Sequence, residues 1–546
     1  PGFQRMREYL RQSCDHIWVI DCSPEGHQPE VNTRIFQGVQ QPVCIVLASR
    51  SQHKQENTLA SVKFRALPSG KRLDKFKVLQ KLTLTSSGWL KCPDEATAPF
   101  LPQARKTWRS YPALEDFFTY HGSGVMPGRT WIIAPDQASL TQRWEALIQA
   151  PTMDRKEALF HPHWRKGKPG DKHVAKTVKE PLPGQPTRNL SIAEETKPPL
   201  QPIRYGFRSF DRQWIIPDSR LINQPNPTLW THYSTHQIYL TAFLQESPKS
   251  GPALTITALI PDLHHYKGSF GGRVFPLWAD KTATTPNLQQ GVLNLLSQTY
   301  GSGVRPSALF AYIAAIAAHP DFTARFQKDL ATPGIRIPLT ASAELFQEAV
   351  AIGERVIWLH TFGERMADAQ KGRSAGPPRL PEKKRPKIPK NGTIPTDPER
   401  MPAEIRYDAD QGRLWVGEGY IDNVPVAVWN YEVSGKQTVL HWFSYRKKNR
   451  ERPRIGDKRP PSPLNDLYPD RWLPEYTTEL INLLNVLGLL IELEPQQADL
   501  LDRICSGSLL SEKKLQDVSL SAAFGSSAST SCSSPSENPD QLSFRF

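Results

Sequence analysis

Residues 17–20, Ile-Trp-Val-Ile, and residues 43–47, Val-Cys-Ile-Val-Leu, are two unbroken apolar runs near the start of the chain. Runs of this length that are rich in β-branched residues are typical of strands buried on both faces of a sheet. Before them, Phe3, Met6 and Leu10 have the spacing of one helix face. The sequence therefore predicts a helix, a strand and a strand hairpin from an α/β sheet. Because these elements cannot close a domain alone, we expect a sheet edge that upstream sequence must cover.

The composition favours several folded units and a polyanionic partner. At 546 residues the chain is longer than a single hydrophobic core usually grows, which is about 250–300 residues. Its 14 Trp, 15 Tyr and 22 Phe can fill such cores, whereas its 50 Pro favour loops, edge strands and linkers. The 68 Lys and Arg exceed the 54 Asp and Glu, which gives a net charge of +14. An excess of this size is typical of proteins that bind nucleic acid.

The cysteines and the apolar runs exclude further classes. The longest apolar run, Leu480–Leu493, contains several polar residues and is shorter than a membrane span of about 20 residues, so we expect no membrane partner. The chain begins at Pro1 within a predicted helix, and we therefore expect a fragment of a longer protein. The six cysteines contain no C-x-x-C pair, which argues against a disulfide scaffold or zinc ribbon and for a reducing, cytoplasmic setting: Cys14, Cys22, Cys44, Cys92, Cys505 and Cys532.

Periodicity locates the main elements of the second half. Helical spacing predicts helices over 308–318 and 343–359. Alternation with a period of two predicts strands over 405–428, in a β unit that ends at Tyr445. A helix over 477–493 follows, with Pro495 opening a second helix.

Composition divides the chain into six parts. The stretches 161–200 and 371–390 are basic and rich in Pro or Gly, which favours linkers. The predicted parts are an α/β domain over 1–150, a basic linker over 151–200, an α+β region with helices over 201–365, a basic Pro-rich linker over 366–403, a β unit with helices over 404–507 and a disordered tail over 508–546.

The chain lacks the motifs of an autonomous enzyme. A DNA amino-methyltransferase needs a Gly-rich turn for its cofactor and a [DNS]-P-P-[YFW] loop that holds the flipped base, and neither occurs. No G-x-x-x-x-G-K-[ST] motif for nucleotide hydrolysis occurs either. We therefore predict no catalytic and no cofactor-binding residues in this chain. The histidines at 161, 163, 264 and 265 lack the spacing of metal ligands, and we interpret them as loop histidines.

Three stretches that alternate cationic and aromatic residues suit a nucleic-acid surface. The alternative for the first is a structural strand in which Arg208 pairs with Asp211, for the second a simple turn, and for the third a solvated loop that continues to Arg454. The candidate DNA-binding residues are Arg204, Tyr205, Arg208, Phe210 and Arg212 in the first stretch, Lys267, Ser269 and Arg273 in the second, and Tyr445, Arg446 and Lys447 in the third.

Several sequence blocks, in order, resemble the C-terminal half of type ISP restriction–modification enzymes, which are single-chain adenine-N6 DNA methyltransferases with a specificity domain. The resemblance implies the α/β edge of a class I methyltransferase fold at the N-terminus, followed by an α+β target-recognition region. It also implies that Gly124 and Arg129 lie near the DNA groove, and that the complete enzyme uses S-adenosyl-L-methionine. The blocks are residues 17–48, 123–131, 204–223, 262–278, 309–326 and 428–446.

Our main hypothesis is that the chain recognises duplex DNA sequence as part of an adenine methyltransferase, with methyl transfer supplied by a missing N-terminal part. The alternative is a protein-interaction or assembly module. Its support is the terminal segment Gln541–Phe546, a glutamine followed by spaced apolar residues, which resembles peptides that dock into sliding clamps. A self-sufficient enzyme of unknown chemistry is the weakest of the three, because no acid–base or nucleophile constellation stands out.

Overall fold

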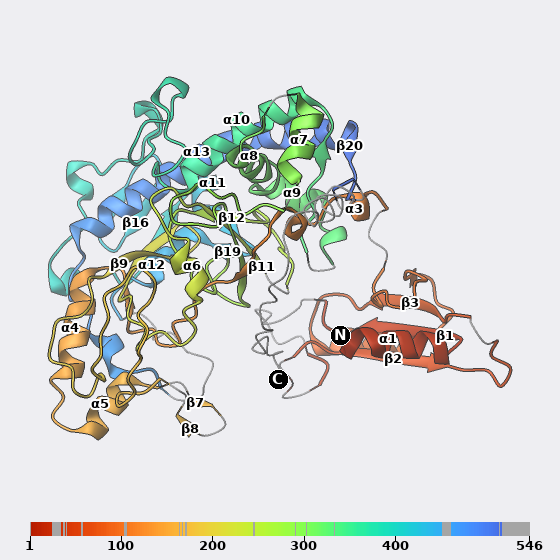
Figure 1. Cartoon of the computed structure of the whole chain (residues 1–546), viewed down its shortest axis with the longest axis horizontal. Helices are drawn as coiled ribbons and strands as arrows, with labels where there is room; N and C mark the ends of the chain where they lie inside the picture. The colour runs from red at the N-terminus through yellow and green to blue at the C-terminus, as the bar shows by residue number, and fades with distance from the viewer. Residues whose placement is uncertain are drawn as a thin grey trace, which may run out of the picture. The chain divides into compact units, whose positions relative to one another are not determined.

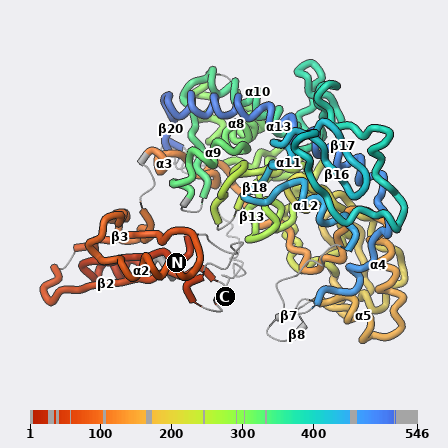
Figure 2. The backbone as a smooth tube through the Cα atoms, turned by 180° about the vertical axis from the view of Figure 1, so that it is seen from behind, coloured from red at the N-terminus to blue at the C-terminus, as the bar shows by residue number. Residues whose placement is uncertain are grey.

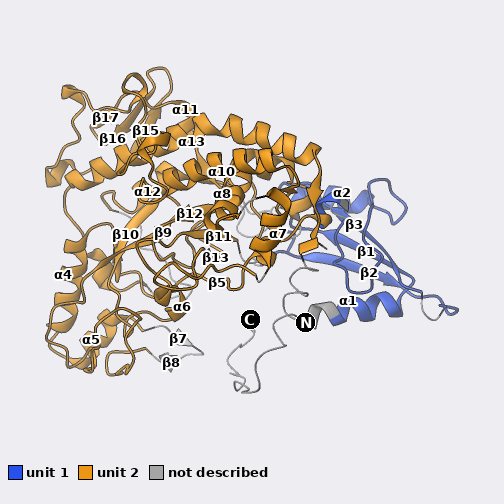
Figure 3. Ribbon diagram, turned by 45° about the horizontal axis from the view of Figure 1, so that its top comes forward, with its two compact units in different colours: residues 1–109 blue, residues 110–546 orange. Residues whose placement is uncertain are grey.

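The chain forms two compact units in its computed structural model, residues 1–109 and 110–546 (Figure 3). The predicted boundary at residue 150 therefore lies inside the second unit. The predicted positions Arg450, Arg452, Arg454 and Gln541–Phe546 lie outside the described residues. The structure describes residues 2–24, 34–36, 39, 41–55, 58–102, 106–162, 164–165, 168–169, 172–243, 246–289, 291–301, 303–331, 334–449, 460–512 and 514–515.

Unit 1 is a four-stranded sheet in the order β2-β1-β3-β4, with β1 parallel to β3 and antiparallel to β2. Ile17 and Val19 of β1 pack with Leu10 of α1, whereas Ile20 packs in a second cluster with Val78 and Leu79 of α2. The predicted helix and strands are therefore present, and β1 is buried on both faces. The elements are α1 (Gly2–Ser13), β1 (His16–Asp21), β2 (Cys44–Ser49), β3 (Ser61–Ala66), α2 (Arg72–Lys81) and β4 (Leu90–Lys91), with α3 (Lys106–Ser110) at the unit boundary.

Strand β2 differs from the prediction in its burial. Val46 is 44% exposed and Leu47 is 41% exposed, so this run is not buried on both faces. The reason is its position, because β2 is the edge strand and pairs only with β1 among the described residues. An apolar, unpaired edge of this kind is a template for pairing with another strand.

Unit 2 contains several small sheets whose strands are mostly antiparallel (Figure 1). Figure 2 shows the course of its backbone from behind. One sheet has the order β6-β10-β9 and another the order β12-β11-β13-β5. Its strands are β5 (Gly122–Ser123), β6 (Ile133–Ala134), β7 (Trp164–Arg165), β8 (Lys168–Pro169), β9 (Ile203–Arg208), β10 (Asp211–Ile215), β11 (Tyr239–Phe243), β12 (Thr255–Thr257), β13 (Gly272–Pro276), β14 (Leu339–Thr340), β15 (Ile405–Asp408), β16 (Arg413–Val416), β17 (Gly419–Ile421), β18 (Glu432–Val433), β19 (Lys436–Gln437) and β20 (Leu509–Leu510).

The helices of unit 2 include the predicted ones over 308–318 and 343–359. Two predicted strand segments are helical instead: the residues after Val424 form α11, and those before Tyr445 form α12. Helix α11 packs against α13 and α12, and the α12 residues Trp442 and Phe443 pack against Trp472. The helices are α4 (Gln137–Ile148), α5 (Met153–Phe160), α6 (Pro227–Thr231), α7 (Val292–Tyr300), α8 (Pro306–Ala317), α9 (Pro320–Arg325), α10 (Ala343–His360), α11 (Val426–Asn430), α12 (Thr438–Ser444) and α13 (Pro474–Ser506).

Helices α8, α10 and α13 pack against one another and form the helical core of unit 2 (Figure 3). Gly353 of α10 is required there, because a Cβ atom at this position would lie 1.8 Å from the Ala311 carbonyl oxygen of α8. The sequence predicts two helices separated at Pro495, but α13 continues through this proline to Ser506. Tertiary packing therefore outweighs the local preference for a break. By length and composition α13 could cross a membrane, yet 67% of its most apolar window is buried within the chain, as is common for a core helix.

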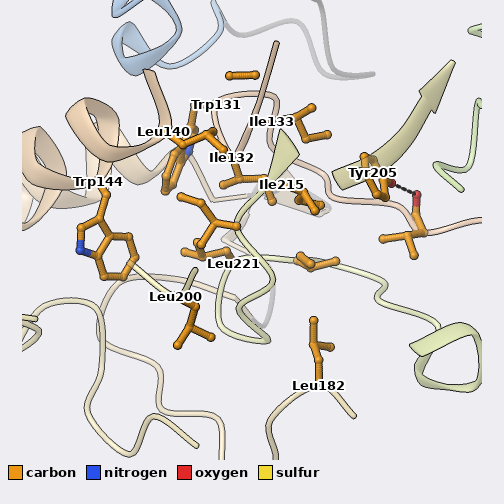
Figure 4. Close-up of a cluster of buried hydrophobic side chains, with 14 of the residues drawn as sticks. Trp131, Ile132, Ile133, Leu140, Trp144, Leu182, Leu200, Tyr205, Ile215 and Leu221 are labelled. Atoms are coloured by element: carbon orange, nitrogen blue, oxygen red, sulfur yellow. Dashed lines mark hydrogen bonds between the residues drawn. The ribbon is translucent and has the colours of Figure 1, made fainter. Parts of the chain in front are cut away.

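Residues 151–200, predicted to be a linker, contribute to the core of unit 2. Val174, Leu182, Ile192 and Leu200 are each less than 7% exposed and belong to one hydrophobic cluster. Figure 4 shows Leu182 and Leu200 in this cluster with Trp131 and Trp144. The apolar residues of this segment are widely spaced between Pro, Gly and Lys, so they show no period that would mark a buried element.

Residues 366–403, the second predicted linker, form a strap that is bonded to α10, to α13 and to the residue after β17. The Leu380 N–H donates to Asn485 Oδ1 at 2.9 Å, Arg379 donates to Asn482, and Lys384 Nζ lies 2.7 Å from Glu492 Oε1. Short 3-10 turns at four places shape the strap: Ala369–Lys371, Glu382–Lys384, Lys390–Gly392 and Pro398–Arg400. Leu509 and Leu510, which fall within the predicted disordered tail, instead form β20 and pair with β14.

We predict that Asn485→Ala destabilises unit 2. Asn485 is fully buried, and its loss would leave the buried Leu380 N–H without an acceptor, at a cost of about 1–3 kcal/mol. Urea unfolding followed by tryptophan fluorescence would measure the change. The control is Glu492→Ala, which removes an exposed ion pair of the same strap and should cost less than about 1 kcal/mol. Equal effects of the two variants would contradict the assignment of Asn485 as the anchor.

Candidate nucleic-acid interface

The first predicted motif, Arg204–Arg212, forms the hairpin of β9 and β10 with Ser209 and Phe210 at its turn. Phe210 has a positive φ of 63°, which is uncommon for an aromatic residue. Two contacts fix the turn. Ser209 Oγ donates to the Tyr266 carbonyl at 2.7 Å, and the centres of the Phe210 and His360 rings are 4.7 Å apart. The hairpin is therefore fixed in position by its surroundings.

Asp262 is the acceptor at the centre of the first polar cluster. Arg208 Nη1 donates to Asp262 Oδ1 at 2.7 Å, and the fully buried Tyr205 donates its hydroxyl to Asp262 Oδ2 at 3.0 Å. Gly124 allows the neighbouring backbone to approach, because a Cβ atom there would lie 2.4 Å from the Asp262 carbonyl oxygen. The alternative interpretation of this stretch, a structural strand in which Arg208 pairs with Asp211, is correct in expecting an internal ion pair. It is wrong about the partner, which is Asp262.

Asp211 pairs with Arg446 instead. The side chain of Arg446 is fully buried, and its Nη2 lies 2.8 Å from Asp211 Oδ1 and 3.2 Å from Glu479 Oε2. Glu479 also accepts from Arg204 at 2.8 Å. These four residues, together with Arg208 and Asp262, are called the arginine network below. It joins the β9–β10 hairpin to the end of α12 and to the first turns of α13.

Three further predicted arginines are also engaged within the chain. Arg129 is 1% exposed, and its guanidinium donates to two backbone carbonyls and to an asparagine side chain. Arg212 lies 2.7 Å from Glu364, and Arg273 lies 2.7 Å from Glu115. Of these, Arg212 and Arg273 keep part of their side-chain surface exposed.

Tyr445 and Lys447 flank the buried Arg446. The Tyr445 ring packs edge-on against Phe207 with centroids 5.0 Å apart, and its hydroxyl lies 3.0 Å from His441 Nε2. Lys447 is only partly buried. Tyr445 and Arg446 of the third predicted stretch therefore pack within the chain, and Lys447 keeps part of its surface exposed.

Two lysines from separate parts of the sequence, Lys249 and Lys436 of β19, lie near enough to Lys267 to lower its pKa. We call these three residues the lysine surface. Lys249 and Lys436 are exposed, and Lys267 is half-buried. Backbone contacts hold the loops together, because Ser434 donates its N–H to the Ser250 carbonyl at 2.9 Å in the hairpin that carries Lys436. The surface therefore has a defined shape built from separate parts of the sequence.

The loop around Lys267 is closely packed. Gly268 has a φ of 97°, and a Cβ atom there would lie 2.7 Å from the His441 ring. The Lys267 ammonium lies 5.9 Å from the centre of the Phe243 ring and 5.6 Å from that of Phe270. Burial lowers the pKa of Lys267, and the other two lysines lower it further, while two nearby glutamates act in the opposite direction. The shift therefore results first from burial of the ammonium and second from the neighbouring lysines. Ser269 belongs to the same loop.

Sequence reasoning missed Asp262, Glu479, Lys249 and Lys436. The two acids are 54 and 275 positions from the arginines they bind, Arg208 and Arg204, so no local pattern connects them. Asp262 opens the block 262–278 and Lys436 lies in the block 428–446 that the resemblance singles out, and these were the available signals. The two lysines lie outside every basic run.

We predict that Arg446→Ala destabilises unit 2 by about 3–5 kcal/mol. The substitution leaves Asp211, which is 2% exposed, as a buried charge without its cation. Lys447→Ala is the matched control, because the neighbouring lysine is partly exposed and should change stability by less than about 0.5 kcal/mol. Unfolding midpoints in urea would measure both, and an unchanged midpoint for Arg446→Ala would refute the network's structural role.

The predicted loop histidines have individual hydrogen-bond partners. His161 Nε2 lies 2.9 Å from the Pro460 carbonyl, His264 Nδ1 accepts from the Gly271 N–H at 3.0 Å, and His265 Nδ1 lies 2.9 Å from Thr241 Oγ1. Position 163 lies outside the described residues. Within the described ranges, no group of three or more His, Cys, Asp or Glu side chains is placed to hold a metal ion.

Three buried histidines make the fold sensitive to acid. Burial lowers the pKa of His265, His360 and His441 to about 3 each, and the nearby Arg208 adds to the effect for His265 and His441. The folded chain keeps these rings neutral, whereas the unfolded chain protonates them below its ordinary pKa of about 6.5. The contribution of these rings to the free energy of unfolding is therefore fully present above pH 6.5. It decreases as the pH falls from there towards 3, by up to about 1.4 kcal/mol per pH unit for each ring.

We predict that His360→Asn reduces this acid sensitivity. Asparagine can retain the acceptor for the Ile256 N–H, which His360 Nδ1 provides at 3.3 Å, but it does not titrate. The slope of melting temperature against pH between 7 and 5 should become shallower, even if the variant is less stable at pH 7. His236→Asn, at an exposed position, should leave the slope as in the parent chain. An unchanged slope for His360→Asn would mean that this ring does not control the transition.

Residues 116–483 match the family model described as the type ISP C-terminal specificity domain. The chain belongs to this family. The match begins at the start of unit 2 and ends within α13, so it includes the whole arginine network and the lysine surface. It confirms the resemblance on which the sequence analysis relied. No curated protein matches the chain.

Solved structures show the same fold at low identity. The chain is similar to DrdV in a DrdV–DNA complex (15% identity, TM-score 0.59), to a nuclease-deletion mutant of the type ISP enzyme LlaGI with a DNA substrate mimic (14%, 0.57), and to the ATP-dependent type ISP enzyme LlaBIII bound to DNA (13%, 0.60). Each alignment covers 93% of this chain but only 49% of the DrdV chain, 38% of the LlaGI chain and 32% of the LlaBIII chain. The chain thus spans less than half the length of these proteins.

Proposed function

We propose that the chain recognises duplex DNA sequence as the specificity part of a type ISP restriction–modification enzyme. The observation that carries the proposal is the family match over residues 116–483. The similar DrdV, LlaGI and LlaBIII structures support it, since each was solved with DNA or a DNA mimic. The net charge of +14 is consistent with a polyanionic partner.

Within this proposal, the lysine surface contacts the DNA backbone and the arginine network supports it. Lysine is a compact point charge that suits phosphate contacts, and the loop with Lys267 and Ser269 adds backbone amides. Arg273 and Lys447, which are partly exposed, can extend this surface. The buried Arg208, Arg446 and Tyr205 instead hold the β9–β10 hairpin and the loop of Asp262 in place.

We further propose that an N-terminal part outside this chain performs adenine-N6 methylation with S-adenosyl-L-methionine. Unit 1 would then be the edge of a class I methyltransferase sheet. The support is the apolar edge of β2 and the coverage of less than half of the similar proteins. The described residues of unit 1 do not themselves fit the cofactor: the turn after β1, Cys22–Pro24, contains no glycine, and its Ser23 N–H is bound by Asp21. No step of methyl transfer is therefore assigned to them.

We predict that Lys249→Ala/Lys436→Ala weakens DNA binding and lowers its salt dependence. Each lysine that neutralises a phosphate contributes about 0.9 to the slope of log affinity against log salt, so the slope should fall by about 2. Fluorescence anisotropy with a labelled duplex across a salt series would measure both quantities. Lys281→Ala/Lys328→Ala removes the same charge from exposed positions elsewhere in unit 2 and should cause a smaller change. Equal slopes for the two double variants would show that the DNA interface does not include the lysine surface.

A further inference from the structure

A groove of about 500 Å³ lies between the strap, α11, α13 and the turn after β15. Its volume is within the range of about 300–1,000 Å³ found for ligand pockets. The arginine network and the lysine surface contribute no residue to it. The groove is lined by Leu380, Lys383, Lys384, Gln411, Gly412, Asn423, Val424, Pro425, Val428, Gly488, Ile491 and Glu492.

The floor of the groove is apolar. Leu380, Val424 and Val428 are each less than 4% exposed, and Ile491 is partly exposed beside them. Val426 on α11, between the lining residues Pro425 and Val428 in sequence, is 52% exposed. An exposed valine next to an open apolar groove favours contact with another apolar surface.

The rim of the groove is cationic. The strap segment Arg379–Lys390 contains six basic residues and a single acid, Glu382. Lys383 and Lys384 line the groove itself, and both are exposed. The acid on the α13 side, Glu492, is already paired with Lys384 at 2.7 Å. The groove therefore presents an apolar floor below an excess of positive charge.

We propose that this groove docks a short acidic peptide segment of a partner protein, with apolar side chains on the floor and carboxylates against the strap. Peptides that bind grooves in this way use a few apolar anchors for affinity, and charge complementarity selects among them. Duplex DNA matches the rim but not the floor, because the surface of DNA is made of phosphates and polar base edges. This interaction is distinct from DNA recognition and does not depend on it.

Selection from a random dodecapeptide display library on the full chain tests the proposal. We expect the enriched peptides to combine Asp or Glu with Leu, Ile or Phe. Binding of each synthetic peptide, measured by fluorescence anisotropy, should weaken at least tenfold for Lys383→Glu/Lys387→Glu and for Ile491→Glu. The first variant changes only exposed side chains, so it remains informative if the second one fails to fold. Lys281→Glu/Lys328→Glu reverses two exposed charges elsewhere and should leave binding unchanged.

Other occupants give different results. Enrichment of basic or wholly apolar peptides, or equal binding to parent and groove variants, would overturn the proposal. Displacement of the selected peptides by duplex DNA, together with weaker DNA binding of Lys383→Glu/Lys387→Glu, would make the groove part of the DNA interface. Displacement by a synthetic peptide of residues 537–546 would reassign the groove to a segment of the same chain. Concentration-dependent self-association lost in Ile491→Glu would assign it to a second copy.

Discussion

The buried pairing of arginine with carboxylate is the interaction on which unit 2 depends. Asp211 and Asp262 are 2% and 4% exposed, and an isolated carboxylate at such positions would be strongly unfavourable. Arg446 and Arg208 supply the compensating charges, and Glu479 connects the pairs to α13. Because breaking a buried pair costs far more than an exposed one, these contacts fix the β9–β10 hairpin relative to α12 and α13. The loops that carry the lysine surface are built on this fixed frame.

The same residues explain why the sequence alone could not separate structural arginines from candidate DNA-binding ones. Alternating arginine and aromatic residues are equally compatible with phosphate and base contacts and with internal ion pairs and cation–π contacts. In this chain Arg208 lies over Phe207, Arg212 over Phe362 and Arg446 over Trp442. The partners that distinguish the two interpretations, Asp262 and Glu479, are distant in sequence. A single sequence carries no information on which distant acid meets which arginine.

The fold could be predicted where periodicity was strong and not where composition was the only guide. The strand β1 and the helices α8 and α10 follow clear apolar patterns and were predicted. The Pro-rich strap was interpreted as a linker, although proline also restricts a chain and favours one ordered path. The polar residues that interrupt α13 could have indicated where the strap binds. Asn482, Asn485 and Gly488 are three residues apart, so they share one helix face. That face is where the strap binds.

The division between arginine and lysine follows from their chemistry. A guanidinium offers five donors in a planar fork, so a buried arginine can satisfy several acceptors together. Arg446 binds a carboxylate and a backbone carbonyl, and Arg129 binds two backbone carbonyls and the side-chain amide of Asn223. An ammonium is more strongly hydrated and stays at the surface, as Lys249 and Lys436 do. In this chain the arginines of the arginine–aromatic motif are therefore used mainly inside the fold, and the exposed lysines are the cations left for the proposed contact with DNA. Net charge alone does not separate these two uses, because it counts both alike.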